Sequence, residues 1–103
     1  MTIIAGDFIY LEPWEAETSE RFAEELYKEI SKGHILFGVR VKIITRRCDR
    51  DDFLFSLLDE PETYAQVHLT WKHEELAEWP KTLMFSSFDE WVRDSMLPDN
   101  KYY

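Results

Sequence analysis

Three successive stretches of this chain alternate between two sets of side chains, and this pattern constrains the fold more than any other feature. The stretches cover residues 39–44, 53–58 and 64–71. Successive side chains of a strand point to opposite faces of a sheet, so a period of two residues is typical of a half-buried β-strand. Short polar turns, at Asp49–Asp52 and around Pro61, join the three stretches. The sequence therefore predicts an antiparallel meander.

The alternation also sorts the residues of the predicted strands onto two faces. The face expected to form the core carries Val39, Val41, Ile43, Phe53, Phe55, Leu57, Ala65, Val67, Leu69 and Trp71. The opposite face is expected to carry Arg40, Lys42, Arg46, Tyr64, Gln66, His68 and Thr70, with Leu54 and Leu58 between them. A shift of register by one residue would invert these assignments.

An apolar stripe at helical spacing precedes the predicted strands. Phe22, Leu26 and Ile30 recur at intervals of four residues, which is typical of a helix that buries one face. Pro13 suits a first helical position, and Gly33 is expected to end the helix. The sequence therefore predicts an N-terminal helix between these two residues.

A second helix is predicted after the strands. Residues 83–85 are expected to form a short edge strand, and Ser87 and Glu90 have the spacing of a capping box. The apolar stripe that follows is expected to end at Pro98, with a frayed tail beyond it. The predicted fold class is α+β: an antiparallel meander of three to four strands with an N-terminal and a C-terminal helix packed on one face.

Length and composition predict one soluble domain in a reducing compartment. The chain has 103 residues, hydrophobic residues make up 45% of it, and residues 1–103 are expected to form a single domain. Cys48 is the sole cysteine, the N-terminus lacks the features of a signal peptide, and a cytoplasmic location is expected. Residues 1–11 are expected to form either a short strand or a packed extended arm.

The net charge of −9 narrows the classes of partner. A chain this acidic is repelled by phosphate backbones, so free nucleic acid is not expected as a partner. No apolar run approaches the roughly 18–20 residues that span a bilayer, so no membrane is expected as a partner either. The alternative is that the acidic residues serve only to keep the chain soluble.

One strand resembles a known sequence pattern. Residues 64–71 read YAQVHLTW, which resembles the YAxVHLTW stretch of a family of small bacterial proteins. The resemblance extends to Arg46, Arg47, Asp51, Asp52, Leu54, Phe55, Leu57, Trp79, Pro80, Phe85 and Trp91, and it does not include the first 33 residues. It carries no catalytic residue with it. It implies an independent small domain rather than a fragment.

The polar face of the sheet is one candidate binding site. The residues concerned are Arg40, Lys42, Arg46, Tyr64, His68 and Thr70. Cations, a histidine and a tyrosine on one face suit an anionic ligand or a partner of mixed polarity, whereas the alternative is a solvated face. His68 is the candidate acid or base, but no paired acid, nucleophile elbow or glycine-rich phosphate loop accompanies it in the sequence.

Metal and redox chemistry have little support in the sequence. His34, Cys48, His68 and His73 do not have the spacing of a zinc site, so neither a metal nor a cofactor is expected. Cys48 lies among arginines, which favour a thiolate, but Asp49 offsets them, and a half-buried structural cysteine is expected.

An acidic, aromatic loop is the second candidate site. Glu74, Glu75 and Glu78 precede Trp79, and carboxylates around an aromatic anchor are what an inhibitor of a basic protein needs. The favoured hypothesis is a non-enzymatic binding module of the inhibitor or immunity type that neutralises a basic toxin or nuclease, as a monomer or weak homodimer. The alternatives are a small enzyme or small-molecule binder centred on His68 and Arg46, and a module that self-associates through the sheet.

Overall fold

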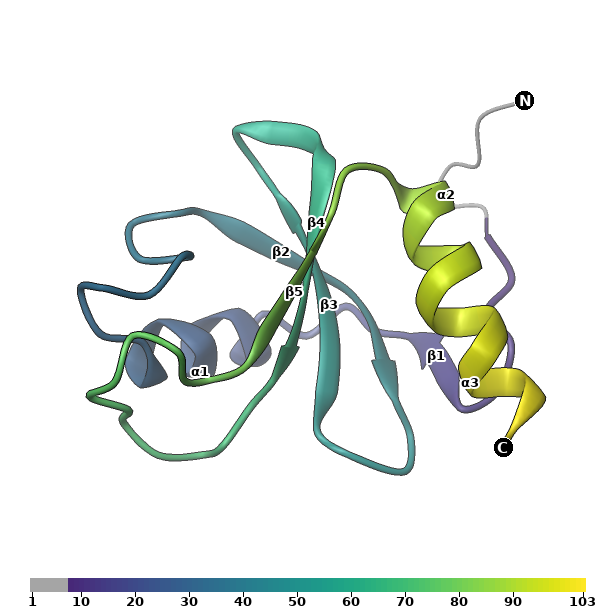
Figure 1. The fold of residues 1–103 in the computed structure, drawn as a ribbon, viewed down its shortest axis with the longest axis horizontal. Coiled ribbons are helices and arrows are strands. Elements are labelled where there is room, and N and C mark those ends of the chain that lie inside the picture. The colour runs from purple at the N-terminus through teal and green to yellow at the C-terminus, as the bar shows by residue number, and fades with distance from the viewer. Residues whose placement is uncertain (1–7) are drawn as a thin grey trace.

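The computed structural model describes residues 8–103, and residues 1–7 lie outside that description. Five antiparallel strands form one sheet, in which strands adjacent in sequence are also adjacent in space (Figure 1). The strands are β1 (Trp14–Ala16), β2 (Val41–Arg47), β3 (Asp52–Leu57), β4 (Glu60–His68) and β5 (Thr82–Phe85). The α+β class, the meander and the edge strand β5 are confirmed. The sheet also has a strand, β1, that the sequence analysis did not predict, so three to four strands was too few.

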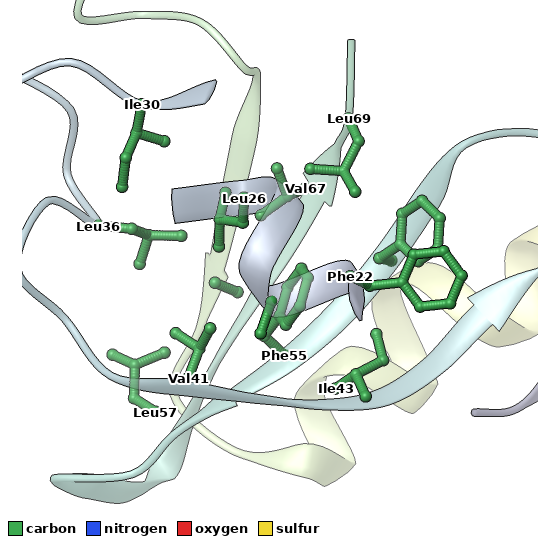
Figure 2. Close-up of a cluster of buried hydrophobic side chains, with 13 residues drawn as sticks. Phe22, Leu26, Ile30, Leu36, Val41, Ile43, Phe55, Leu57, Val67 and Leu69 are labelled. Carbon is green, nitrogen blue, oxygen red and sulfur yellow. The ribbon is translucent and has the colours of Figure 1, made fainter. Parts of the chain in front are cut away.

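Helix α1 (Arg21–Glu29) covers one face of this sheet. Its buried residues Phe22 and Leu26 meet the apolar residues of β2, β3 and β4 in one cluster (Figure 2). Phe53, Phe55 and Val67 are fully buried there. The predicted apolar face is therefore confirmed, except for Trp71, which follows the end of β4 and remains about half exposed.

The C-terminal helical segment covers the opposite face, which corrects the prediction that both helices lie on one face (Figure 1). The segment comprises α2 (Phe88–Trp91), a π-helical turn η2 (Val92–Met96) and α3 (Leu97–Lys101). It packs on a second cluster of Trp14, Leu54, Phe85, Phe88, Trp91, Val92 and Met96. Leu54 and Phe85 point away from α1 and give this face of the sheet an apolar surface. Burial of that surface stabilises a helix on this side.

The chain before α1 also differs from the prediction. Pro13 does not begin a helix, because the next three residues pair with Thr45–Arg47 as strand β1. This pairing places the Trp14 side chain in the second cluster, where it is buried edge-on against Trp91 with ring centroids 5.0 Å apart. The helix then ends at Glu29, before Gly33, because the backbone becomes extended at Ile30 and that side chain joins the core.

The C-terminal helix does not end at Pro98, and the tail is not frayed. Proline lacks a backbone N–H, and the helix accommodates Pro98 after a π-helical turn, in which the Leu97 N–H donates to the Val92 carbonyl five residues back. Asp99 then accepts a hydrogen bond from Trp14 Nε1 at 2.8 Å, and Asn100 donates one to the carbonyl of Glu12 at 2.7 Å. The last residues of the chain are therefore tied to its N-terminal part.

A β-bulge in β2 changes which side chains share a face. Ile43 pairs with Phe55 and Thr45 pairs with Leu54, so Ile44 is the extra residue. An extra residue shifts the alternation by one position, and the residues after it change faces. Arg46 therefore lies on the α1 face, opposite to its predicted side.

The segment before β1 is described only from residue 8. Phe8 and Tyr10 pack against the second cluster, with their rings 5.2 and 6.3 Å from that of Phe88. Residues 8–11 form no strand, so of the two alternatives the packed extended arm is correct for these four residues. The rest of the prediction for residues 1–11 concerns residues that the structure does not describe. Within residues 8–103, every helix is too short or too polar to cross a bilayer.

Candidate functional site

The acidic loop, residues 70–81, is held at its start by a buried carboxylate. Trp71 has a φ of 61°, which is uncommon for a residue other than glycine. The Glu29 side chain, which is fully buried, accepts hydrogen bonds from the backbone N–H of Thr70 and of Trp71, both at 2.8 Å. The Thr70 hydroxyl donates a third bond at 3.0 Å. Glu29 therefore fixes the turn in which the chain leaves the sheet.

Further hydrogen bonds tie the loop to α1 and to the segment after it. The N–H of Glu74 donates to the Glu29 carbonyl at 2.7 Å, and His73 Nδ1 lies 3.0 Å from the Lys28 carbonyl. At the far end, His34 Nδ1 accepts the N–H of Leu36, so Nε2 carries the proton and donates to the Pro80 carbonyl at 2.8 Å. The loop is therefore fixed at both ends.

The loop displays apolar side chains beside its acids. Trp71, Leu76 and Trp79 are 51%, 59% and 40% exposed. Glu75 and Glu78 are exposed as well, whereas the side chain of Glu74 is only 14% exposed and lies 4.0 Å from Lys72 Nζ. Of the predicted loop residues, Glu75, Glu78 and Trp79 face solvent, and Glu74 is mostly covered.

Burial changes the acidity of Glu29. Its pKa is raised to about 7, chiefly by desolvation and further by a hydrogen bond with the Glu25 side chain. The donors at Thr70 and Trp71 oppose the increase, because they favour the charged form. The group that fixes the loop therefore titrates near neutral pH.

The sheet-face candidates are not brought together. Arg40 forms an exposed ion pair with Asp59 at 2.6 Å, and Lys42 is exposed in β2. Arg46, moved by the bulge, has its guanidinium 5.1 Å from the ring centroids of both Phe22 and Phe53. The predicted site that combined His68 with Arg46 is therefore wrong, because the two side chains lie on opposite faces.

The C-terminal helix covers a further part of that predicted surface. Tyr64 packs against Phe88 with ring centroids 5.5 Å apart, and burial raises the pKa of its hydroxyl. Gln66 accepts hydrogen bonds from Trp91 and Ser95, and Thr70 is engaged by Glu29. Of the predicted face, His68 remains at the uncovered end.

His68 has the acidic partner that was not found in the sequence. Asp52 lies directly opposite His68 in the pairing of β3 with β4, and its Oδ1 is 2.7 Å from His68 Nδ1. Arg50 Nε contacts the other carboxylate oxygen at 2.9 Å. The signal was present in the alternation: once Phe53 is placed opposite Val67, Asp52 must lie opposite His68. Glu29 and His34 carried no comparable signal, because their contacts are 41 and 46 residues away in sequence.

Within residues 8–103, no three His, Cys, Asp or Glu side chains are grouped so that they could hold a metal ion. Cys48 is exposed rather than half-buried as predicted, and its Sγ lies 3.8 Å from the Tyr103 hydroxyl.

Comparisons with protein-family models, curated proteins and solved structures found no match to this chain. The resemblance of residues 64–71 to a bacterial family therefore stays a prediction. Any functional conclusion depends on the chain's own geometry.

Proposed function

We propose that this chain is a non-enzymatic binding module that neutralises a basic protein partner, as an inhibitor or immunity-type protein does. The observation that carries the proposal is the fixed loop, which exposes Trp71, Leu76 and Trp79 next to Glu75 and Glu78. These three side chains line one hollow, and a contiguous apolar patch on a surface often marks an interaction site.

Rigidity favours this loop as a binding surface. Ordering a flexible loop on binding costs conformational entropy, and a loop that is already fixed avoids that cost. The anchors at Glu29 and His34 hold both ends before any partner arrives. Tryptophan is the side chain most often found to dominate binding energy at protein interfaces.

The charge of the chain supports a basic partner. A net charge of −9 attracts a cationic protein over a distance, and Glu75 and Glu78 lie where its arginines and lysines would meet the aromatic side chains. The proposal therefore assigns the acids to fast association and the tryptophans to slow dissociation.

The test begins with capture of the partner from native lysate and its identification by mass spectrometry. Binding of the purified pair is then measured by surface plasmon resonance between low and high salt. The double variant Glu75→Lys/Glu78→Lys should lower the association rate about tenfold or more at low salt, and raised salt should reduce the difference. Trp79→Ala should mainly raise the dissociation rate.

The matched control is Glu60→Lys/Glu62→Lys, which makes the same change in net charge. These exposed acids lie at the other end of β4, about 20 Å along the strand from the loop. Equal effects of the two double variants would mean that net charge, not the loop, governs binding. A dominant effect of Arg46→Ala or His68→Ala would contradict the proposal, because it would place the interface on the sheet.

A further inference from the structure

A pocket of about 470 Å³ lies at the uncovered end of the second sheet face. Arg50, Gln66, His68, Trp79, Lys81 and Leu83 line it, around the carboxylate of Asp52. The pairing of β4 with the chain that leads into β5 brings these residues together, since the His68 N–H donates to the Lys81 carbonyl at 3.0 Å. The loop proposed to bind a protein contributes Trp79 and Lys81 to this pocket.

The charge of the pocket is opposite to that of the whole chain. Arg50 and His68 each occupy one oxygen of Asp52, whose side chain is only 9% exposed. Lys81 forms no ion pair with any residue between 8 and 103. Two permanent cations and a histidine therefore face a single carboxylate whose two oxygens are already engaged. A chain of charge −9 thus has a locally cationic pocket.

The contact with Asp52 also prepares His68 for a ligand. The carboxylate of Asp52 engages Nδ1 at 2.7 Å, which leaves Nε2 as the ring nitrogen that can contact a ligand. Nε2 has no hydrogen-bond partner within residues 8–103, and the side chain is 44% exposed.

The pocket has apolar surface beside these cations. Trp79 and Leu83 are both partly exposed, and Trp79 also lines the neighbouring hollow between His68, Trp71 and Leu76. Small-molecule sites characteristically combine apolar walls with a few polar groups that fix orientation. A flat apolar group could pack on the indole while an attached anion meets Lys81 and His68.

We infer that this pocket binds a small organic anion, a carboxylate or phosphate attached to an aromatic or apolar group. The inference is independent of the proposed protein partner, since it depends on Lys81, His68 and Arg50 and not on the acids of the loop. The two sites share Trp79 but require ligands of opposite charge.

The experiment is a titration of the isotope-labelled protein followed by two-dimensional NMR. The probes are phenyl phosphate, benzoate, inorganic phosphate and the uncharged benzyl alcohol. We expect saturable shifts at the Trp79 indole N–H and at His68 with the two aromatic anions. Inorganic phosphate and benzyl alcohol should bind about tenfold more weakly, because each makes only one half of the contacts. The relative affinities of phenyl phosphate and benzoate identify the preferred anion.

Matched variants separate a built site from general charge. Lys81→Ala should weaken phenyl phosphate binding about tenfold, whereas Lys42→Ala, which removes another exposed lysine, should leave it unchanged. His68→Gln should weaken phenyl phosphate binding several-fold, and Trp79→Leu should remove the preference over inorganic phosphate. Non-saturable shifts with every probe, or equal effects of Lys81→Ala and Lys42→Ala, would overturn the inference.

Discussion

The two faces of the sheet are covered in different ways. On the α1 face, an apolar cluster joins the helix to three strands, and its members follow the simple alternation of the sequence. The hydrogen bonds of α1 through Tyr27 and Glu29 lie outside this cluster. On the other face, the C-terminal helix is positioned by polar contacts as well as apolar ones. Gln66 accepts hydrogen bonds from Trp91 Nε1 at 2.9 Å and from the Ser95 hydroxyl at 2.6 Å. Trp14 donates to Asp99 in the same layer.

This difference explains where the candidate sites lie. Apolar contacts are non-directional, so the α1 cluster stabilises the sheet without requiring one particular partner for each side chain. Hydrogen bonds to Gln66 require one position of the C-terminal helix, and in that position the helix leaves the His68 end of the face open. The pocket at His68 and the loop after β4 both occur where this coverage ends.

The largest expected effect on stability comes from substitutions in the apolar cluster on the α1 face. Phe55→Ala should lower the free energy of unfolding by about 3–5 kcal/mol, because the truncation leaves a cavity in a fully buried site. Val67→Asp should prevent folding, since it places an unpaired carboxylate in the same cluster. Urea denaturation followed by circular dichroism measures both. Leu58→Ala, at an exposed position, is the control and should change stability by less than about 0.5 kcal/mol. A wild-type melting curve for both core variants would contradict the assignment of this face.

The sequence predicted the α1 face because its apolar residues occupy every second position along each strand. Phe53, Phe55 and Val67 could be assigned without knowing any distant contact. The second face could not be assigned in this way, because its residues do not form one apolar set. Leu54 is apolar but alternates with polar neighbours, and Gln66 is itself polar. The cluster that covers this face includes Trp14. The sequence analysis expected Pro13 to begin a helix and therefore did not assign Trp14 to the sheet.

The residues of the candidate sites differ in the same way: some were predictable from the local sequence and others were not. The exposed acids and tryptophan of the loop are local features, so Glu75, Glu78 and Trp79 were predicted from composition alone. The bulge at Ile44 reversed the face of Arg46, and nothing in the alternation of a single strand signals an extra residue. Asp52 required the register of two strands. Glu29 and His34 required tertiary contacts that no short pattern contains.

The second prediction tests the one buried acid on the α1 side. The pKa of Glu29 is about 7 in the folded chain against an ordinary value of 4.5, so the folded state binds the proton more tightly. The stabilisation is therefore complete below about pH 4.5 and is lost as the pH rises through 7. Stability should fall by about 2.5 kcal/mol between pH 5 and pH 8, since one pKa unit corresponds to about 1.4 kcal/mol and part of the effect lies below pH 5. Glu29→Gln has no titrating group and should flatten this part of the profile in thermal melts. A variant as pH-dependent as the wild type would show that Glu29 is not the cause.

The smallest expected effect tests whether hydrogen bonds position the C-terminal helix on the second face. If the hydrogen bonds to Gln66 position the C-terminal helix, their loss should cost more than the shape change alone. Gln66→Leu keeps the bulk but leaves the buried Trp91 N–H and the Ser95 hydroxyl without their acceptor, and should cost about 2 kcal/mol. Ser95→Ala removes one donor while Gln66 keeps its bond to Trp91, and should cost about 1 kcal/mol. Urea denaturation measures the two changes, and hydrogen exchange of the Trp91 indole N–H reports whether the helix has loosened locally. Because Gln66→Leu removes both hydrogen bonds, a smaller loss than in Ser95→Ala would mean that apolar packing, and not the bonds to Gln66, positions this helix.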